Sequence, residues 1–305
     1  MTTLTDNRPD DFDVYWTSVQ EELAGIPAVP EVDELPLRST DYATAYVVHM
    51  TSIGPYRIFA HLSIPKGAGP FPTRYYLPRY GSVVEQIPQG FTNAQRREYV
   101  TFSVGVRGQR GADQPFAAAF PGLLTHGISH REAYVYRGIV ADCLRALEYL
   151  VTRPEVDGSK VVAMGGDLAL VTAALGSGLT HLVCTPAMFF ATADAAPRTE
   201  AYPLQEVNDY LRHDPSQRDA VARTLSYFDL RWFAPRVKVP SLVMTEGDGD
   251  LLSGAALAPL TSALGTAPEV NKTRYSGFKD NVYVEEWVTR QFGLAGTILP
   301  AHWQG

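Results

Sequence analysis

The segment KVVAMGGDLALVTAALGSG, residues 160–178, constrains the fold of this chain more than any other stretch. An apolar run rich in valine ends at Gly165 and Gly166, and a stretch of small helix-forming residues starts at once. This order predicts a buried strand, a tight turn and a helix, with Asp167 at the apex of the turn. The N-terminus of such a helix directs free N–H groups and a positive dipole end toward whatever the apex residue holds.

Strands and helices alternate around this segment. A helix near the N-terminus and several β-rich runs are predicted within residues 1–115, and from Tyr134 onward amphipathic helices alternate with buried strands. This alternation predicts the α/β class, with a mostly parallel sheet flanked by helices. No repeat or linker interrupts the chain, so we expect one domain over 1–305, with its α/β core in 116–293 and a tail in 294–305.

Composition narrows the classes of function. The formal net charge is −7 and no run of Lys or Arg occurs, which argues against binding to nucleic acid or to an anionic membrane surface. No window approaches the roughly 20 apolar residues of a membrane span, and no signal peptide is evident, so we expect a cytoplasmic protein that acts on a small molecule. Cys143 and Cys184 lack metal-ligand spacing, and we expect neither a metal nor another cofactor.

Eight motifs follow one another along the chain: DDFDVYW, LPRYGS, VGVRGQ, GLLTHGI, YVYRGIVADCLRALEYL, EVDGSKVVAMGGD, TLSYFDLRWFAPRVKVP and TRYSGF. Together they resemble the acetyl xylan esterase and cephalosporin C deacetylase family of α/β-hydrolases over nearly the whole chain. The resemblance implies an α/β-hydrolase fold, assembly into a ring-like homo-oligomer, and removal of acetyl groups from small esters by a Ser, Asp and His triad.

The chain departs from the family at the positions that carry its chemistry. By the resemblance, the nucleophilic serine falls on Asp167, the histidine on Phe278 and the acid of the triad on Asp250. The backbone N–H groups of Tyr80 and Leu168 match the oxyanion hole. Ester hydrolysis by the family's route needs a hydroxyl nucleophile and a base, and Phe278 cannot accept a proton. We therefore expect no ordinary serine-esterase activity.

One interpretation makes Asp167 an acid/base group. Its carboxylate would move a proton on a bound substrate, with Asp250 as a second carboxylate, while the N–H groups of Leu168 and Tyr80 stabilise a developing negative charge. Cyclisation, elimination, isomerisation or decarboxylation of a small carbonyl metabolite would fit, without a cofactor, as in secondary metabolism. We favour this interpretation.

Two alternatives remain open. Asp167 could be a nucleophile, as in haloalkane dehalogenases and epoxide hydrolases, provided that His126, His130 or His302 replaces the lost base. Alternatively, the site is retired: Asp167 caps the helix and its carboxylate fills the old oxyanion hole. A protein of that kind would bind a ligand or fill a place in an oligomer.

Further residues are expected near the tight turn at 165–167, which we call the elbow. Arg79 either reaches into the pocket to bind a carboxylate or carbonyl, or lies on the rim. Phe278 and Phe189 are expected to wall the pocket, and His126 and His130, on a loop near its entrance, are the candidates for a replacement base. Separately, Arg107 is expected to hold a buried ion pair and not to touch substrate.

Overall fold

A single sheet organises the molecule. The computed structural model describes residues 5, 7–84, 92–109, 112, 114 and 116–299. Within them, nine strands form one sheet in the order β1-β2-β3-β5-β4-β6-β7-β8-β9. The strands are β1 Glu31–Glu34, β2 Ala43–Ser52, β3 Tyr56–Pro65, β4 Phe71–Tyr76, β5 Val100–Gly105, β6 Val156–Gly165, β7 His181–Cys184, β8 Ser241–Thr245 and β9 Glu269–Lys272.

The sheet is antiparallel at one edge and parallel over the rest. β1, β2, β3 and β5 pair antiparallel, whereas every pair from β5 through β4, β6, β7 and β8 to β9 is parallel. Parallel neighbours need long crossover connections, and helices supply them. The predicted α/β class with a mostly parallel sheet is confirmed.

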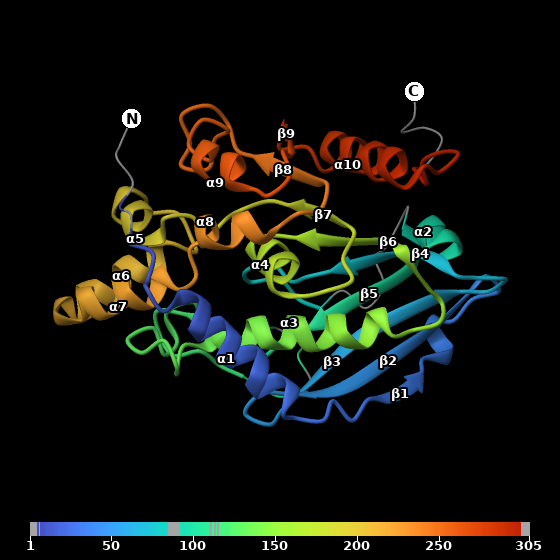
Figure 1. Cartoon of the computed structure of the whole chain (residues 1–305), viewed down its shortest axis with the longest axis horizontal. Helices are drawn as coiled ribbons and strands as arrows, with labels where there is room; N and C mark the ends of the chain where they lie inside the picture. Colours follow the sequence, from blue (N-terminus) through green and yellow to red (C-terminus); the bar gives the residue numbers. More distant parts are fainter. Residues whose placement is uncertain are drawn as a thin grey trace.

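Helices cover both faces of the sheet (Figure 1). They are α1 Phe12–Ala24, α2 Thr92–Glu98, α3 Val135–Val151, α4 Asp167–Leu175, α5 Thr192–Ala195, α6 Gln205–His213, α7 Arg218–Ser226, α8 Leu230–Phe233, α9 Ala258–Ala263 and α10 Gly277–Phe292. Successive residues of β6 face opposite sides: Val161 and Ala163 pack in the larger core with α1, α3 and α4, and Val162 packs with Trp287 of α10.

The helices that follow β7 form a separate layer. Figure 1 shows α5, α6 and α7 gathered at one end of the molecule, beyond the strands. Within the described residues, no helix is long and apolar enough to cross a membrane.

A buried ion pair ties the end of β5 to α3. The guanidinium and the backbone N–H of Arg107 both donate to the carboxylate of Asp142, at distances of 2.7 to 3.0 Å, and the Asp142 side chain is fully buried. The Arg107 guanidinium also lies over the ring of Tyr56, 4.6 Å from its centroid. Gly138 on α3 lies so close to this guanidinium that a Cβ atom would overlap it. The predicted structural role of Arg107 is confirmed.

His61 introduces a titratable group into the antiparallel part of the sheet. It lies on β3, where its ring packs edge-on against Phe59 at 5.2 Å, and its Nδ1 atom is buried without a hydrogen-bond partner among the described residues. Burial lowers the pKa of His61 to about 4, with smaller contributions from Arg38 and His49.

We predict that His61 makes the stability of the protein depend on pH. The depressed pKa in the folded state means that the neutral ring stabilises the fold above the unfolded value of 6.5, and that this contribution is lost as the pH falls toward 4. The loss should reach about 3 kcal/mol. Urea unfolding of the wild type and of His61→Gln at pH 7 and pH 4.5 should show a smaller pH dependence in the variant. His130→Gln, on an exposed turn, is the control, and equal pH dependence in wild type and His61→Gln would contradict the prediction.

Candidate functional site

The turn between β6 and α4 has the predicted form. β6 ends at Gly165, Gly166 precedes the helix, and Asp167 is the first residue of α4. A Cβ on Gly165 would lie 2.9 Å from the carbonyl oxygen of Leu77, and one on Gly166 would lie 3.3 Å from that of Thr185. The two glycines therefore let the backbone beyond β4 and β7 approach the turn closely. A strand, an elbow and a helix with an acid at the apex are confirmed.

The carboxylate of Asp167 is held by the segment that follows β7. Its Oδ1 accepts hydrogen bonds from the N–H groups of Met188 at 3.0 Å and Phe189 at 2.8 Å, and its Oδ2 accepts one from Ala187 at 3.1 Å. Asp167 is only 2% exposed. The carboxylate therefore fills a cradle of three consecutive backbone donors inside the protein.

This arrangement corrects two predictions. The carboxyl does not stand at the mouth of an open pocket, because the segment 187–189 covers it. In the described part of the chain it also receives no hydrogen bond from the backbone of Tyr80 or Leu168 and makes no helix-capping bond, so it does not fill the old oxyanion hole as the retired-site alternative supposed. The side chain turns toward 187–189 because three aligned N–H groups compensate a buried anion better than two.

The environment of Asp167 acts on its pKa in opposite directions. Burial raises the pKa of Asp167, the N–H groups of Phe189, Met188 and Ala187 lower it, and the net direction is upward. The three N–H groups favour the charged form of Asp167, whereas burial away from water favours its neutral form.

Leu168 and Phe189 belong to the core. Leu168 is 4% exposed and packs in the larger hydrophobic cluster. The ring of Phe189 packs against Tyr136 at 4.9 Å and Phe228 at 5.6 Å, and the residue is 1% exposed. Phe189 is therefore a core residue, its place in a pocket wall stays a prediction, and its backbone N–H reaches Asp167.

Tyr80 is held by an acid that the sequence analysis missed. Its O–H donates to Oε1 of Glu206 in the first turn of α6, and Oε2 of Glu206 accepts the N–H of Leu124 at 3.0 Å. Glu206 is 4% exposed, and burial raises its pKa. Gly122 lies against this carboxylate with no room for a Cβ. No local signal marks Glu206, because an acid at the start of an amphipathic helix is usually solvated.

Arg79 lies across the elbow. Its Cγ atom is 3.9 Å from the position that a Cβ on Gly166 would take, and the residue is exposed. Among the described residues its guanidinium has no ion pair or hydrogen bond. Of the two predicted positions, the structure favours the rim.

The remaining predicted residues do not meet Asp167. Asp250 lies exposed in the loop after β8, where its carboxylate accepts the O–H of Tyr275 at 3.3 Å. Phe278 is 39% exposed in the first turn of α10, and its place in a pocket wall stays a prediction. His126 and His130 are exposed on the turns before α3, and the ring of His126 packs against Phe116.

Within the described residues, no hydrogen bond thus pairs Asp167 with a second carboxylate or with a replacement base. Among the described residues, Asp167 forms no hydrogen bond with Asp250, His126 or His130. His302 lies outside the described residues. No group of three or more His, Cys, Asp or Glu in the described ranges is placed to hold a metal ion.

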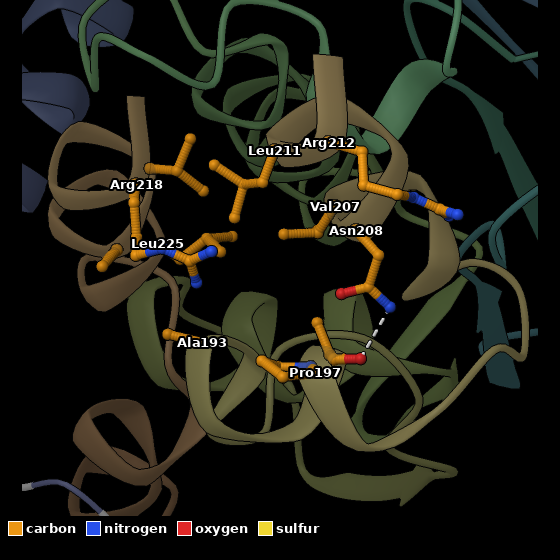
Figure 2. A pocket seen from close by; sticks show the side chains of 11 residues that line it. Ala193, Pro197, Val207, Asn208, Leu211, Arg212, Arg218 and Leu225 are labelled. Atoms are coloured by element: carbon orange, nitrogen blue, oxygen red, sulfur yellow. Dashed lines mark hydrogen bonds between the residues drawn. The ribbon is translucent and has the colours of Figure 1, made fainter. Parts of the chain in front are cut away.

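A cavity lies elsewhere, between α5, α6 and α7 (Figure 2). Its volume is about 220 Å³. Apolar side chains make up most of its lining, among them Ala193, Pro197, Val207, Leu211, Val221 and Leu225. None of the residues predicted to line a pocket borders it.

A mostly parallel sheet, with a glycine elbow between a central strand and its helix, defines an α/β-hydrolase fold. Within that class the chain belongs to the acetyl xylan esterase family, because the family model described as Acetyl xylan esterase (AXE1) matches residues 3–252.

Known proteins agree with this assignment. Acetyl esterase Axe7A of Xylanibacter ruminicola is 26% identical in an alignment of 274 residues that covers 86% of this chain and 61% of that protein. The chain therefore spans less than two thirds of that relative. The crystal structure of acetyl xylan esterase 1 from Thermoanaerobacterium sp. JW/SL YS485 has a TM-score of 0.81 at 21% identity, covering 95% of this chain and 96% of that one. Acetyl xylan esterase from Paenibacillus sp. R4 has a TM-score of 0.79 at 23% identity, with the same coverage of both chains. These two structures show the shared fold.

We predict that Asp167 stabilises the protein. Asp167→Ala would leave three N–H groups of 187–189 buried without an acceptor, and should lower the free energy of unfolding by about 3 kcal/mol in urea denaturation. Asp167→Asn keeps one acceptor oxygen and should fall between wild type and Asp167→Ala. The exposed Asp250→Ala, as control, should change stability by less than about 0.5 kcal/mol. If Asp167→Ala and Asp250→Ala unfold alike, the carboxylate does not support the fold.

Proposed function

We propose that this chain is a non-hydrolytic member of the acetyl xylan esterase family, which binds a ligand and does not turn over an ester at the elbow. One observation carries the proposal. The carboxylate of Asp167, at the position of the nucleophile, is buried and accepts hydrogen bonds from three consecutive backbone N–H groups. A group engaged in this way supports structure, and a substrate has no exposed face of it to approach.

The names of the relatives point to removal of acetyl groups, but by the family resemblance the side chains which that activity requires are replaced in this chain. Acyl transfer by the triad needs a hydroxyl nucleophile and a base that takes its proton. Asp167 and Phe278 supply neither, and Asp250 accepts a hydrogen bond from Tyr275 instead of orienting an imidazole. Loss of a single triad member commonly lowers the rate by several orders of magnitude.

The same geometry weighs against Asp167 as a nucleophile. An alkyl-enzyme ester must be broken by a water that a histidine activates. The histidines that were candidates for this task within the described residues, His126 and His130, lie exposed on their turn. The backbone cradle also holds both carboxylate oxygens.

A second candidate function is the acid/base enzyme expected from the sequence, and one observation favours it. Burial raises the pKa of Asp167, which is the direction that a proton-transfer group at neutral pH requires. For this function the segment 187–189 must open to admit a small carbonyl metabolite. The cytoplasmic location, the small-molecule partner and the homo-oligomer remain predictions on either view.

We predict that the wild type hydrolyses p-nitrophenyl acetate no faster than the denatured protein, because the buried Asp167 carboxylate supplies no hydroxyl nucleophile. Initial rates measured by absorbance test this. Hydrolysis by the wild type that disappears in Asp167→Asn would contradict the proposed function.

Chemical labelling separates the two candidate functions. With a water-soluble carbodiimide and glycinamide, the exposed Asp250 should be modified in the native protein, and Asp167 should be modified only after unfolding. Peptide mass spectrometry measures both residues in one sample, so Asp250 is the internal control. Modification of native Asp167 at a rate comparable to that of Asp250 would favour the acid/base enzyme.

A further inference from the structure

The cavity between α5, α6 and α7 has the walls of a small-molecule site. Val207, Val221 and Leu225 are buried at its apolar inner side, and its volume is about 220 Å³. An engineered apolar cavity of about 150 Å³ binds benzene. This cavity therefore has room for one aromatic ring and a short chain.

An exposed cation, Arg218, borders this apolar space. Figure 2 shows the guanidinium of Arg218 pointing into the cavity from the start of α7. In the described ranges Arg218 forms no ion pair and no side-chain hydrogen bond, whereas Arg212, which also borders the cavity, pairs with Asp209. A guanidinium beside apolar walls is a suitable partner for a carboxylate, which it binds with two parallel hydrogen bonds.

An acceptor borders the same space. The Nδ2 atom of Asn208 donates to the carbonyl oxygens of Ala196 at 2.8 Å and Thr199 at 2.9 Å. Nδ2 also lies 3.1 Å from Oε1 of Gln205, so the amide orientation is fixed by its donor side, and Oδ1 has no donor among the described residues. A hydroxyl group on a ligand would satisfy it.

We propose that this cavity binds a small hydroxylated arylalkanoic acid. The ring packs among Val207, Val221 and Leu225, the carboxylate pairs with Arg218, and the hydroxyl donates to Oδ1 of Asn208. The inference rests on the proposed function in one respect: a protein that binds without hydrolysing at the elbow needs a binding site, and this cavity supplies it.

The test uses 3-(4-hydroxyphenyl)propanoate as the probe and the full chain in isothermal titration calorimetry. We expect wild-type binding with a Kd below about 1 mM, and at least tenfold weaker binding in Arg218→Met. Arg223→Met is the matched control, because Arg223 is exposed on the same helix and does not border the cavity. It should bind like the wild type.

Two further measurements guard the interpretation. Ala222→Leu fills the cavity from the middle of α7 and should abolish binding while circular dichroism stays native. 3-Phenylpropanoate, which lacks the hydroxyl, should bind the wild type about threefold or more weakly, and this comparison probes Asn208 without breaking its two structural bonds.

The proposal is overturned if the probe does not bind the wild type at about 5 mM, or if Arg218→Met and Arg223→Met bind it equally. It is also overturned if the wild type does not bind and Ala222→Leu changes the molar mass in light scattering, since the cavity would then be a contact between copies of the chain. Ester hydrolysis by a wild type that binds the probe would overturn the proposed function alone.

Discussion

The hydrogen bonds from three successive N–H groups to the carboxylate of Asp167 are the constraint on which the arrangement around the elbow depends. They fix the direction in which the chain leaves β7. Once 187–189 is fixed, the ring of Phe189 enters the core against Phe228, and its carbonyl oxygen accepts the N–H of Leu230 at 2.8 Å. α5 starts three residues later, at Thr192, whose hydroxyl bonds back to the carbonyl oxygen of Met188. The elbow therefore supports the layer of helices that follows it.

A second buried carboxylate has a comparable effect on α6. Glu206 binds the O–H of Tyr80 and the N–H of Leu124, and so attaches the first turn of α6 to the loop beyond β4. The next residues of that helix, Val207 and Asn208, border the cavity. Asp167 fixes the approach to α5 and Glu206 fixes α6, so two buried acids hold two walls of the cavity. Asp167 and Tyr80, the partner of Glu206, are both positions that the family resemblance assigns to hydrolysis.

The parts of the fold that follow from local chemistry were predictable from the sequence, and the directions of the buried polar side chains were not. The glycine pair and the change of periodicity at 165–167 are local signals, and they predicted the elbow correctly. The partners of Asp167 lie about twenty residues further along the chain and meet it only because β6 pairs with β7. Likewise, Arg107 was expected to form an ion pair, but Asp142 is brought to it by the packing of α3. Glu206 was missed because its burial depends on Tyr80, which is distant in sequence.

An acid at the elbow has a physical requirement that a serine there would not have. A serine hydroxyl at the elbow is neutral and tolerates an open site until a base removes its proton, whereas an aspartate carries charge from the start. That charge must be compensated by solvent or by backbone donors. In this chain the segment 187–189 both supplies the donors and excludes the solvent. An acid at the elbow thus favours a closed elbow, in which backbone N–H groups take the place of solvent.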